Sequence, residues 1–172
     1  FTSQMVNKGN IRNTGFEISI NATPVASAFT WNVNLNLSLN RNKVISLNDN
    51  GDRILAGSND GNSTHVTVVG KPIGQFFGFV FDGLYTIEDL QNPDVAKNAQ
   101  AYEGGVRYKD LDNDGVISDM LDYTIIGNPH PDFIYGLTNT FTYKDFDLSI
   151  IMNGQCGGKV VNGLRQSIDN LQ

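Results

Sequence analysis

The residues best suited to chemistry lie in one acidic stretch, residues 110–122, which reads Asp-Leu-Asp-Asn-Asp-Gly-Val-Ile-Ser-Asp-Met-Leu-Asp. Carboxylates at its first, third and fifth positions, followed by a glycine at the sixth, form the pattern that opens a calcium-binding loop. This spacing lets oxygen ligands converge on one hard cation, and the glycine permits a sharp turn. Ile117 would anchor the loop in apolar packing. We expect a calcium ion that orders the loop and takes no part in catalysis. The candidate ligands are Asp110, Asp112, Asp114, the carbonyl group of Val116, Asp119 and Asp122.

The second half of the stretch leaves the final ligand open. Calcium loops place a bidentate carboxylate at position twelve, but that position is Leu121, and the acidic residues beside it are Asp119 and Asp122. Carboxylates this close repel one another unless a cation or backbone donors compensate them. The alternative is therefore an acidic turn, held by aspartates that accept hydrogen bonds from backbone amides, with no ion.

Patterns for catalysis are weak in this sequence. His65 and His130 both stand beside turn residues, and His130 lies between Pro129 and Pro131. The sequence contains no nucleophile-elbow, phosphate-loop or dinucleotide-binding pattern. No spacing selects a pair of carboxylates for glycoside hydrolysis. We predict that the protein is not an enzyme.

Composition narrows the classes of protein further. Charged residues make up 17% of the 172 residues, below the roughly 25% of soluble domains. The net charge of −6 argues against nucleic-acid binding. A single cysteine, Cys156, excludes an internal disulfide and a cysteine metal cluster. The chain opens with neither a signal peptide nor an initiator methionine, and no apolar run approaches the ~18 residues of a membrane helix. We interpret the chain as a fragment or a processed product.

Strict alternation identifies the elements that frame the acidic stretch. Residues 29–40 are apolar at every odd position and polar at every even one, which predicts a strand with one apolar face. The strand is long for a soluble domain, where about 5–6 residues are usual, and it suits a bilayer-crossing strand of roughly 9–11 residues. Residues 14–22, 133–143 and 146–153 alternate in the same way, with exceptions at Ile134 and Asn139.

These segments predict an all-β, antiparallel fold built from two hairpins, residues 14–40 and 133–153. Residues 41–132 would form one long outer loop that contains the acidic stretch, and residues 154–172 would form the next loop. Short links at one end and long loops at the other are typical of outer-membrane barrels. A β-sandwich usually has short connections at both ends.

The long loop should contain some regular structure of its own. We expect a short strand at residues 65–69, a helix capped by Thr86 and Asp89, and a second helix starting at Pro93. The aromatic-rich residues 75–85 indicate core packing, with a binding surface as the alternative. A further helix is expected at residues 164–171.

In chain order, these segments resemble the TonB-dependent outer-membrane receptors of the SusC/RagA type, over nearly the whole sequence. The most specific match runs from Tyr-Lys-Asp at residues 108–110 through Gly115, and continues in Ile-Ile-Gly-Asn-Pro-His-Pro at residues 125–131. The other matching segments are residues 10–17, 29–32, 40–44, 70–74, 81–84 and 141–148. The acidic stretch departs from the family pattern by one extra residue before Asp122.

The resemblance implies part of a barrel of about 22 strands with an internal plug, in the outer membrane of a Gram-negative bacterium. It implies import of a large nutrient, a glycan or a peptide, driven through TonB. The implied partners are membrane lipid, a SusD-like surface lipoprotein that acts as a lid, and TonB, which contacts the plug region. The plug, the TonB-contacting segment and most of the barrel lie outside this sequence, so this chain alone would not transport.

A soluble alternative stays open at this point. The chain could be a calcium-stabilised β-module whose two apolar faces pack on each other. Such a module would bind carbohydrate on exposed aromatic rings. The candidate rings are those of Phe76, Phe77, Phe79, Phe81 and Tyr85.

Overall fold

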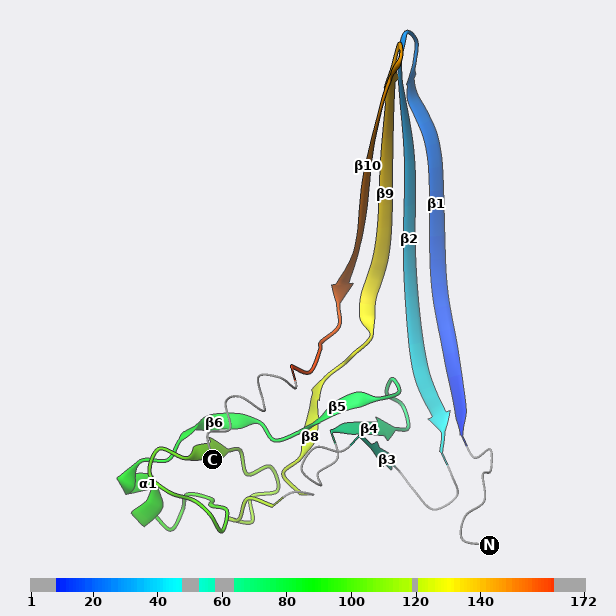
Figure 1. Cartoon of the computed structure of the whole chain (residues 1–172). Helices are drawn as coiled ribbons and strands as arrows, with labels where there is room; N and C mark the ends of the chain where they lie inside the picture. Colours follow the sequence, from blue (N-terminus) through cyan, green and yellow to red (C-terminus); the bar gives the residue numbers. More distant parts are fainter. Residues whose placement is uncertain (1–8, 48–52, 58–63, 119–120, 163–172) are drawn as a thin grey trace, which may run out of the picture. The chain divides into compact units, whose positions relative to one another are not determined.

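The computed structural model describes residues 9–47, 53–57, 64–118 and 121–162. By their internal contacts the residues form two units, residues 11–43 with 129–172, and residues 1–10 with 44–128. Within the described residues, no helix has both the length and the apolar character needed to cross a membrane. The elements, labelled in Figure 1, are β1 (Asn10–Ala26), β2 (Phe29–Ser46), β3 (Arg53–Ala56), β4 (His65–Val68), β5 (Gln75–Gly78), β6 (Phe81–Leu84), α1 (Ile87–Gln91), β7 (Val106–Tyr108), β8 (Thr124–Gly127), β9 (Pro131–Tyr143) and β10 (Phe146–Gly157).

The first unit is one four-stranded sheet in the order β1-β2-β9-β10, whose long strands run side by side in Figure 1. Antiparallel pairing sets Phe29 of β2 opposite Tyr143 of β9, so the tight turns of both hairpins lie at the same end. The two predicted hairpins are confirmed. Their strands are longer than the alternation indicated, since β1 begins at Asn10 and β10 continues to Gly157.

The register gathers most apolar residues of the four strands on one side, with exceptions such as Ile134 and Ile151 on the other. Leu35 stands opposite Leu137, which in turn stands opposite Met152. Asn139 interrupts this apolar side, as predicted, and its Oδ1 accepts a hydrogen bond from the indole nitrogen of Trp31 at 3.1 Å. The asparagine therefore satisfies a donor that would otherwise face apolar surroundings.

The other side of the sheet is polar, and its side chains bond to one another between neighbouring strands. Apart from Glu17, Asp132 and Asp147, the polar residues on this side are uncharged amides and hydroxyls. Such cross-strand pairs stabilise a sheet in addition to the backbone ladder. The bonded pairs are Ser19–Asn36, Thr23–Asn32, Asn21–Asn34, Glu17–Ser38 and Thr140–Ser149.

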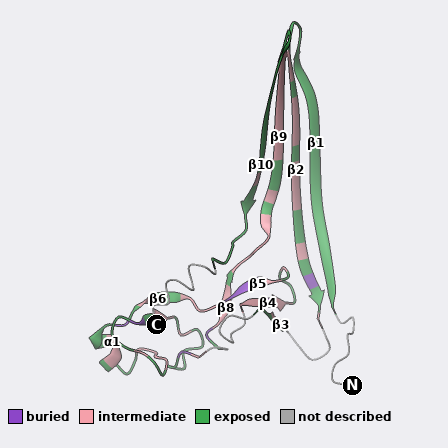
Figure 2. Ribbon diagram, viewed as in Figure 1, coloured by how far each residue is buried: buried purple, intermediate pink, exposed green. Residues whose placement is uncertain are grey.

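The apolar side of the sheet carries no second layer from its own strands. Figure 2 shows β1 and β10 exposed along their lengths. Over residues 11–43 and 129–162, no side chain is buried. The exposed fractions reach 57% at Leu148 and 78% at Phe146. The two hairpins thus lie side by side in one sheet. The soluble alternative requires them to pack face to face, and they do not.

The second unit has a small core built from short elements. Its main sheet has the strand order β3-β4-β5-β8, and β6 pairs with β7. The predicted short strand near residue 65 is confirmed as β4. The buried apolar side chains of this unit are Val44, Val66, Phe76, Phe77, Tyr85 and Ile117.

The aromatic-rich segment around β5 mostly packs inward. Phe79 stacks on Tyr108 with ring centroids 4.5 Å apart and meets Tyr123 edge-on at 4.4 Å. Phe76, Phe77 and Tyr85 belong to the core just described, whereas Phe81 is 63% exposed. A continuous aromatic binding face on these residues is therefore not formed, which removes the support for the soluble carbohydrate-binding alternative.

The helix predictions have mixed outcomes. Thr86 caps α1 as predicted, and its side chain and that of Asp89 form a reciprocal capping box. The second helix, predicted to begin at Pro93, is wrong, because residues 93–95 form a turn. The Lys97 ammonium donates to the main-chain oxygens of Asn92 and Val95, which a continuing helix would need as acceptors. The helix predicted at residues 164–171 lies outside the described residues.

Candidate functional site

The acidic stretch forms a closed loop between β7 and β8. Asp110 opens it by accepting hydrogen bonds from the backbone amides of Asn113, at 2.6 Å, and Gly115, at 2.9 Å. The chain turns sharply here because Asn113 and Gly115 have φ angles of 61° and 83°. Glycine adopts this left-handed region without steric cost, as the calcium-loop pattern anticipates.

The middle of the loop is held from both sides. Asp114 Oδ1 accepts from the Val116 amide at 2.7 Å. Ile117 is buried, and its amide donates to the carbonyl of Lys97 at 3.0 Å. The anchoring role predicted for Ile117 is confirmed.

Asp122 closes the loop. Its carboxylate is fully buried, with Oδ1 accepting from the Leu111 amide at 2.7 Å and Oδ2 from the Ser118 amide at 2.8 Å. One side chain thereby joins the two ends of the loop. A buried carboxylate is tolerated when donors surround it, and here the backbone provides them.

The loop brings three of the six candidate ligands together. Carboxylate oxygens of Asp110, Asp112 and Asp122 all lie within 4.8 Å of one another. Calcium binds oxygen at about 2.3–2.6 Å, so ligands around one ion stand up to roughly 5 Å apart. The three carboxylates therefore fit a single calcium ion. Asp114 is outside this group, and Asp119 lies outside the described residues.

The loop also agrees with the alternative, an acidic turn in which aspartates accept hydrogen bonds from backbone amides and no ion is bound. Six backbone amides donate to the four aspartates at 110, 112, 114 and 122, so the loop is folded by its own hydrogen bonds. The ion itself stays a prediction.

The carboxylates of the loop differ in acidity. The amide of Gly115, helped by that of Asn113, lowers the pKa of Asp110. Desolvation raises the pKa of Asp112, and the negative charges of Asp114 and Asp122 raise it further. A cation at this point would relieve the repulsion on Asp112 and restore its charged form.

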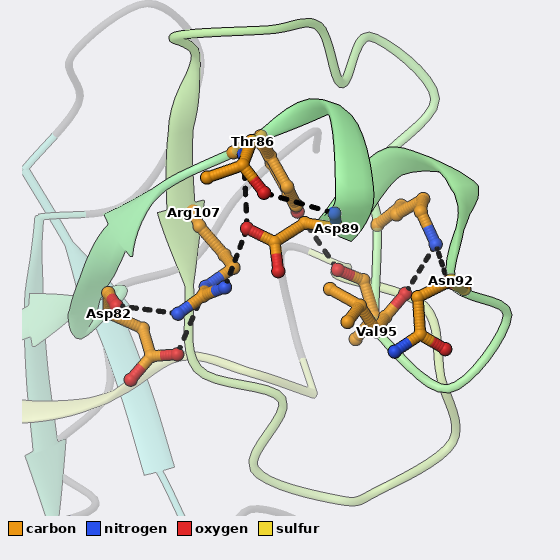
Figure 3. A network of polar contacts seen from close by, with 9 residues as sticks. Asp82, Thr86, Asp89, Asn92, Val95 and Arg107 are labelled. Carbon is orange, nitrogen blue, oxygen red and sulfur yellow. Dashed lines mark hydrogen bonds and ion pairs between the residues drawn. The ribbon is translucent and has the colours of Figure 1, made fainter.

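A second polar network ties α1 to the β6–β7 pair (Figure 3). Arg107 Nη1 lies 3.0 Å from Asp89 Oδ2 on α1, and its Nη2 donates to the Asp82 carbonyl at 3.1 Å. Its Nε lies 3.2 Å from Asp82 Oδ2, in an orientation that makes an ion pair and not a hydrogen bond. Arg107 therefore links three consecutive elements of the unit.

Sequence reasoning found only one part of this network, the Thr86–Asp89 cap. The Thr86 amide lowers the pKa of Asp89 most, and the charge of Arg107 adds to the shift. No local pattern marked Arg107, because its partners are 18 and 25 residues away in the chain.

Neither histidine belongs to the described group of carboxylates that lie close together. His65 Nδ1 is 2.8 Å from Thr64 Oγ1, and its ring is 5.1 Å from that of Phe76. His130 belongs to the unit of the long sheet.

Comparison with known proteins identifies the family. A TonB-dependent receptor of Formosa agariphila is 34% identical over 166 residues, which is 94% of this chain and 16% of that receptor. A second TonB-dependent receptor of the same organism is 34% identical over 165 residues, with the same coverage. SusC of Bacteroides thetaiotaomicron, also a TonB-dependent receptor, is 28% identical over 171 residues. The chain belongs to the SusC/RagA-type TonB-dependent receptors. No model of a known protein family matches it.

Solved structures agree on the fold of this SusC/RagA-type segment. The RagAB peptide importer in its closed-closed state matches 92% of the chain with a TM-score of 0.65 and 17% identity. The open-open state of the same importer matches 87% with a TM-score of 0.61 and 15% identity. The predicted antiparallel all-β class is confirmed.

The segment spans about a sixth of the proteins that it matches, 16% of the first Formosa receptor and 15% of SusC. These relatives are named as receptors and not as enzymes, which agrees with the absence of a catalytic pattern in the sequence.

Proposed function

We propose that the chain forms part of the wall and one outer loop of an outer-membrane importer. The complete receptor would take up a large polar nutrient, a glycan or a peptide, using energy delivered through TonB. A SusD-like surface lipoprotein would close over it from outside. The family membership supports this proposal, and one feature of the long sheet carries it.

That feature is a pair of aromatic bands on the apolar side of the sheet. On β9, Tyr143 and Phe133 lie ten residues apart at the two edges of this side. At about 3.4 Å per residue the separation is roughly 34 Å along the strand. With a strand tilt of 35–45° it spans about 24–28 Å across a bilayer, close to the ≈ 25 Å apolar band of outer-membrane barrels. The turn-end band consists of Phe29, Trp31, Phe141, Tyr143 and Phe146, and the far band of Phe16, Phe133 and Tyr135.

Lipid would also account for the exposure of the apolar side. Large apolar side chains such as Phe146 and Leu148 stay more than half exposed in the chain. Burying each of them is worth about 1.5–3 kcal/mol. In hydrocarbon, polar groups must find partners within the protein, as Trp31 and Asn139 do at 3.1 Å.

We also propose that the acidic loop binds one calcium ion through Asp110, Asp112 and Asp122. The mutual distances of their oxygens support a cation at this point, and so does the raised pKa of Asp112, which desolvation raises most and the charges of Asp114 and Asp122 raise further. Asp114, the Val116 carbonyl and Asp119 are the further candidate ligands. The ion would order the loop, while Ile117 and the backbone amides hold its framework.

The function is tested by uptake in living cells. Cells that express the complete receptor are supplied with pools of labelled oligosaccharides or peptides, with TonB present or deleted. We expect one pool to be imported only when both the receptor and TonB are present. Uptake that is unchanged without TonB, or a complete receptor found outside the outer membrane, would contradict the proposal.

A further inference from the structure

The basic residues of the long sheet are concentrated at one end. Its four strands contain three of them, Arg12 on β1 and Arg41 and Lys43 on β2. All three are exposed and lie at the end far from the tight turns. Counting in steps of two from Phe16 on β1 and from Leu39 on β2 assigns them to the apolar side of the sheet. The acidic residues of the strands belong to the polar side.

The register of the β1–β2 hairpin continues to this end without a shift. A Cβ added at Gly15 would lie 3.7 Å from the Cα atom of Asn40, so these two residues face each other across the hairpin. A Cβ added at Gly9 would lie 3.6 Å from the main-chain oxygen of Ser46. Six positions back along one strand thus correspond to six positions forward along the other, and no bulge lies between the two pairs.

This register sets Arg12 directly opposite Lys43. Residues in that position have Cβ atoms about 4.5–5.5 Å apart, and like charges there destabilise a sheet. Among the described residues, neither Arg12 nor Lys43 forms an ion pair. Arg41 is different, because a carboxylate oxygen of Asp132 lies 3.2 Å from its guanidinium and compensates its charge. An anion held between Arg12 and Lys43 would remove their repulsion.

The depth of this cation pair matches the headgroup region of the proposed bilayer. Arg12 is four residues beyond Phe16, which belongs to the far aromatic band. The separation is roughly 14 Å along the strand, or about 10–11 Å along the membrane normal at a tilt of 35–45°. Aromatic belts mark the boundary between hydrocarbon and headgroups, and each headgroup layer is about 5–8 Å thick. Long basic side chains bend toward such a layer while their backbone stays beyond it.

We propose that Arg12 and Lys43 bind one phosphate group of a lipid in the outer leaflet of the membrane. The proposal rests on the proposed function, which puts the loop end of the sheet on the outside of the cell. Arginine binds phosphate through two parallel N–H donors, and lysine binds it as a point charge. Phe16 and Ile18, which follow on the same side of β1 and are 60% and 36% exposed, would contact the acyl chains of this lipid.

The placement favours a lipid over a soluble phosphate compound. A nutrient would pass through the interior of the barrel, which the polar side of the sheet faces in the proposed orientation. Arg12 and Lys43 continue the apolar side instead. A lipid also presents its phosphate beside its acyl chains, so one molecule would cover both the cation pair and the apolar surface next to it. Anionic lipid surfaces attract arginine and lysine in this way.

The test titrates the complete receptor, purified in detergent, and counts bound lipid by native mass spectrometry. The probes are diphosphoryl lipid A, dephosphorylated lipid A and inorganic phosphate. We expect diphosphoryl lipid A to bind at least about tenfold more tightly than the dephosphorylated form. Arg12→Gln and Lys43→Gln should each weaken its binding about fivefold, since each removes one cation. Inorganic phosphate should not compete, because it lacks acyl chains.

A matched control moves the charge to the other side of the strand. Arg12→Asn combined with Asn13→Arg keeps the composition and the net charge, but places the arginine on the polar side. This double variant should lose about as much affinity as Arg12→Gln. Arg12→Lys, which keeps a cation on the apolar side, should lose less. Heat-modifiable migration on gels establishes that each variant is assembled.

Equal affinities of the parent and the charge-swapped double variant would overturn the lipid site, because net charge alone would then explain the binding. Equal affinities for the two forms of lipid A would overturn it too, as would competition by inorganic phosphate. Uptake in cells separates the two proposals. A receptor that imports its nutrient through TonB but does not prefer phosphorylated lipid A overturns the lipid site and leaves the importer standing. A receptor without TonB-dependent uptake overturns the importer itself.

Discussion

A charge placed in the middle of the apolar side gives the sharpest test of the membrane assignment. Leu137 of β9 is flanked by Leu35 on one neighbouring strand and Met152 on the other. It lies four residues from Phe133 and six from Tyr143, so it is near the middle of the proposed lipid-facing band. The nearer edge is roughly 13 Å away along the strand. Leu137→Arg therefore places a guanidinium close to the bilayer midplane.

Thr138→Arg is the matched control. Thr138 follows Leu137 on the same strand, stands opposite Asn34 and Ile151, and belongs to the polar side. In the proposed barrel, an arginine there would face the water-filled interior at the same depth. Arginine at the midplane of the lipid face costs about 2–4 kcal/mol, whereas a change on a wet surface is usually within about 0.5 kcal/mol.

The assay is chemical unfolding of the complete receptor in lipid vesicles, followed by the loss of heat-modifiable migration. We expect Leu137→Arg to lose about 2–4 kcal/mol and Thr138→Arg to stay near the parent. A soluble module predicts no such loss for Leu137→Arg, since arginine on an exposed apolar surface would change stability little. Equal stabilities, or a larger loss for Thr138→Arg, would refute the orientation of the sheet.

Four further predictions concern the acidic loop, the α1 network and the β9–β10 turn. Calcium should raise the melting temperature of the complete receptor, and EGTA should lower it. Asp122→Asn should abolish this calcium-dependent shift and should cost about 1–3 kcal/mol of stability, because its hydrogen bonds with the backbone amides are weakened. A parent melting temperature that does not respond to calcium or EGTA would mean that the loop is only a turn. Arg107→Met should make the α1 amides exchange hydrogen about fivefold faster, since it removes a partly exposed ion pair. The pKa of Asp89 is lowered from 3.8 in the fold, so its contribution to α1 is complete above about pH 4 and is lost as the pH falls through the lowered value. Exchange measured from pH 7 to pH 3 and corrected for intrinsic rates checks this, and protection lost already at pH 6 would contradict it. Lys144→Gly should stabilise the β9–β10 turn by about 1 kcal/mol, because Lys144 has a φ of 53°; Asp145→Gly, at a turn residue without a positive φ, should show no such gain in the same unfolding assay.

Local chemistry allowed much of this protein to be predicted before its structure. Side chains on a strand alternate between two sides, so residues 29–40 revealed a long strand and both of its faces without any partner. The Asp-x-Asp-x-Asp-Gly spacing predicted a tight loop anchored by Ile117, and the Thr86–Asp89 spacing predicted the start of α1. Each of these signals acts within a few residues, where backbone geometry alone fixes which groups meet.

Other features depend on residues that are distant in the chain, and no local pattern contains them. The pairing of β2 with β9, about ninety residues later, made one sheet of two hairpins and gave Asn139 its partner, Trp31. Asp122 reaches the backbone amides of both Leu111 and Ser118, which joins the two ends of the loop. The Lys97 ammonium donates to the main-chain oxygens of Asn92 and Val95, which the expected second helix would have needed as acceptors.

The sequence by itself determined the strands, their two faces and the acidic loop, because these follow from short-range periodicity and spacing. Only the tertiary structure decided that the apolar sides join into one surface with aromatic residues at both edges. It alone brought Arg12 and Lys43 opposite each other. The physical reason is that strand register is set by interactions across the whole sheet, so residues far apart in sequence become neighbours only when the sheet forms.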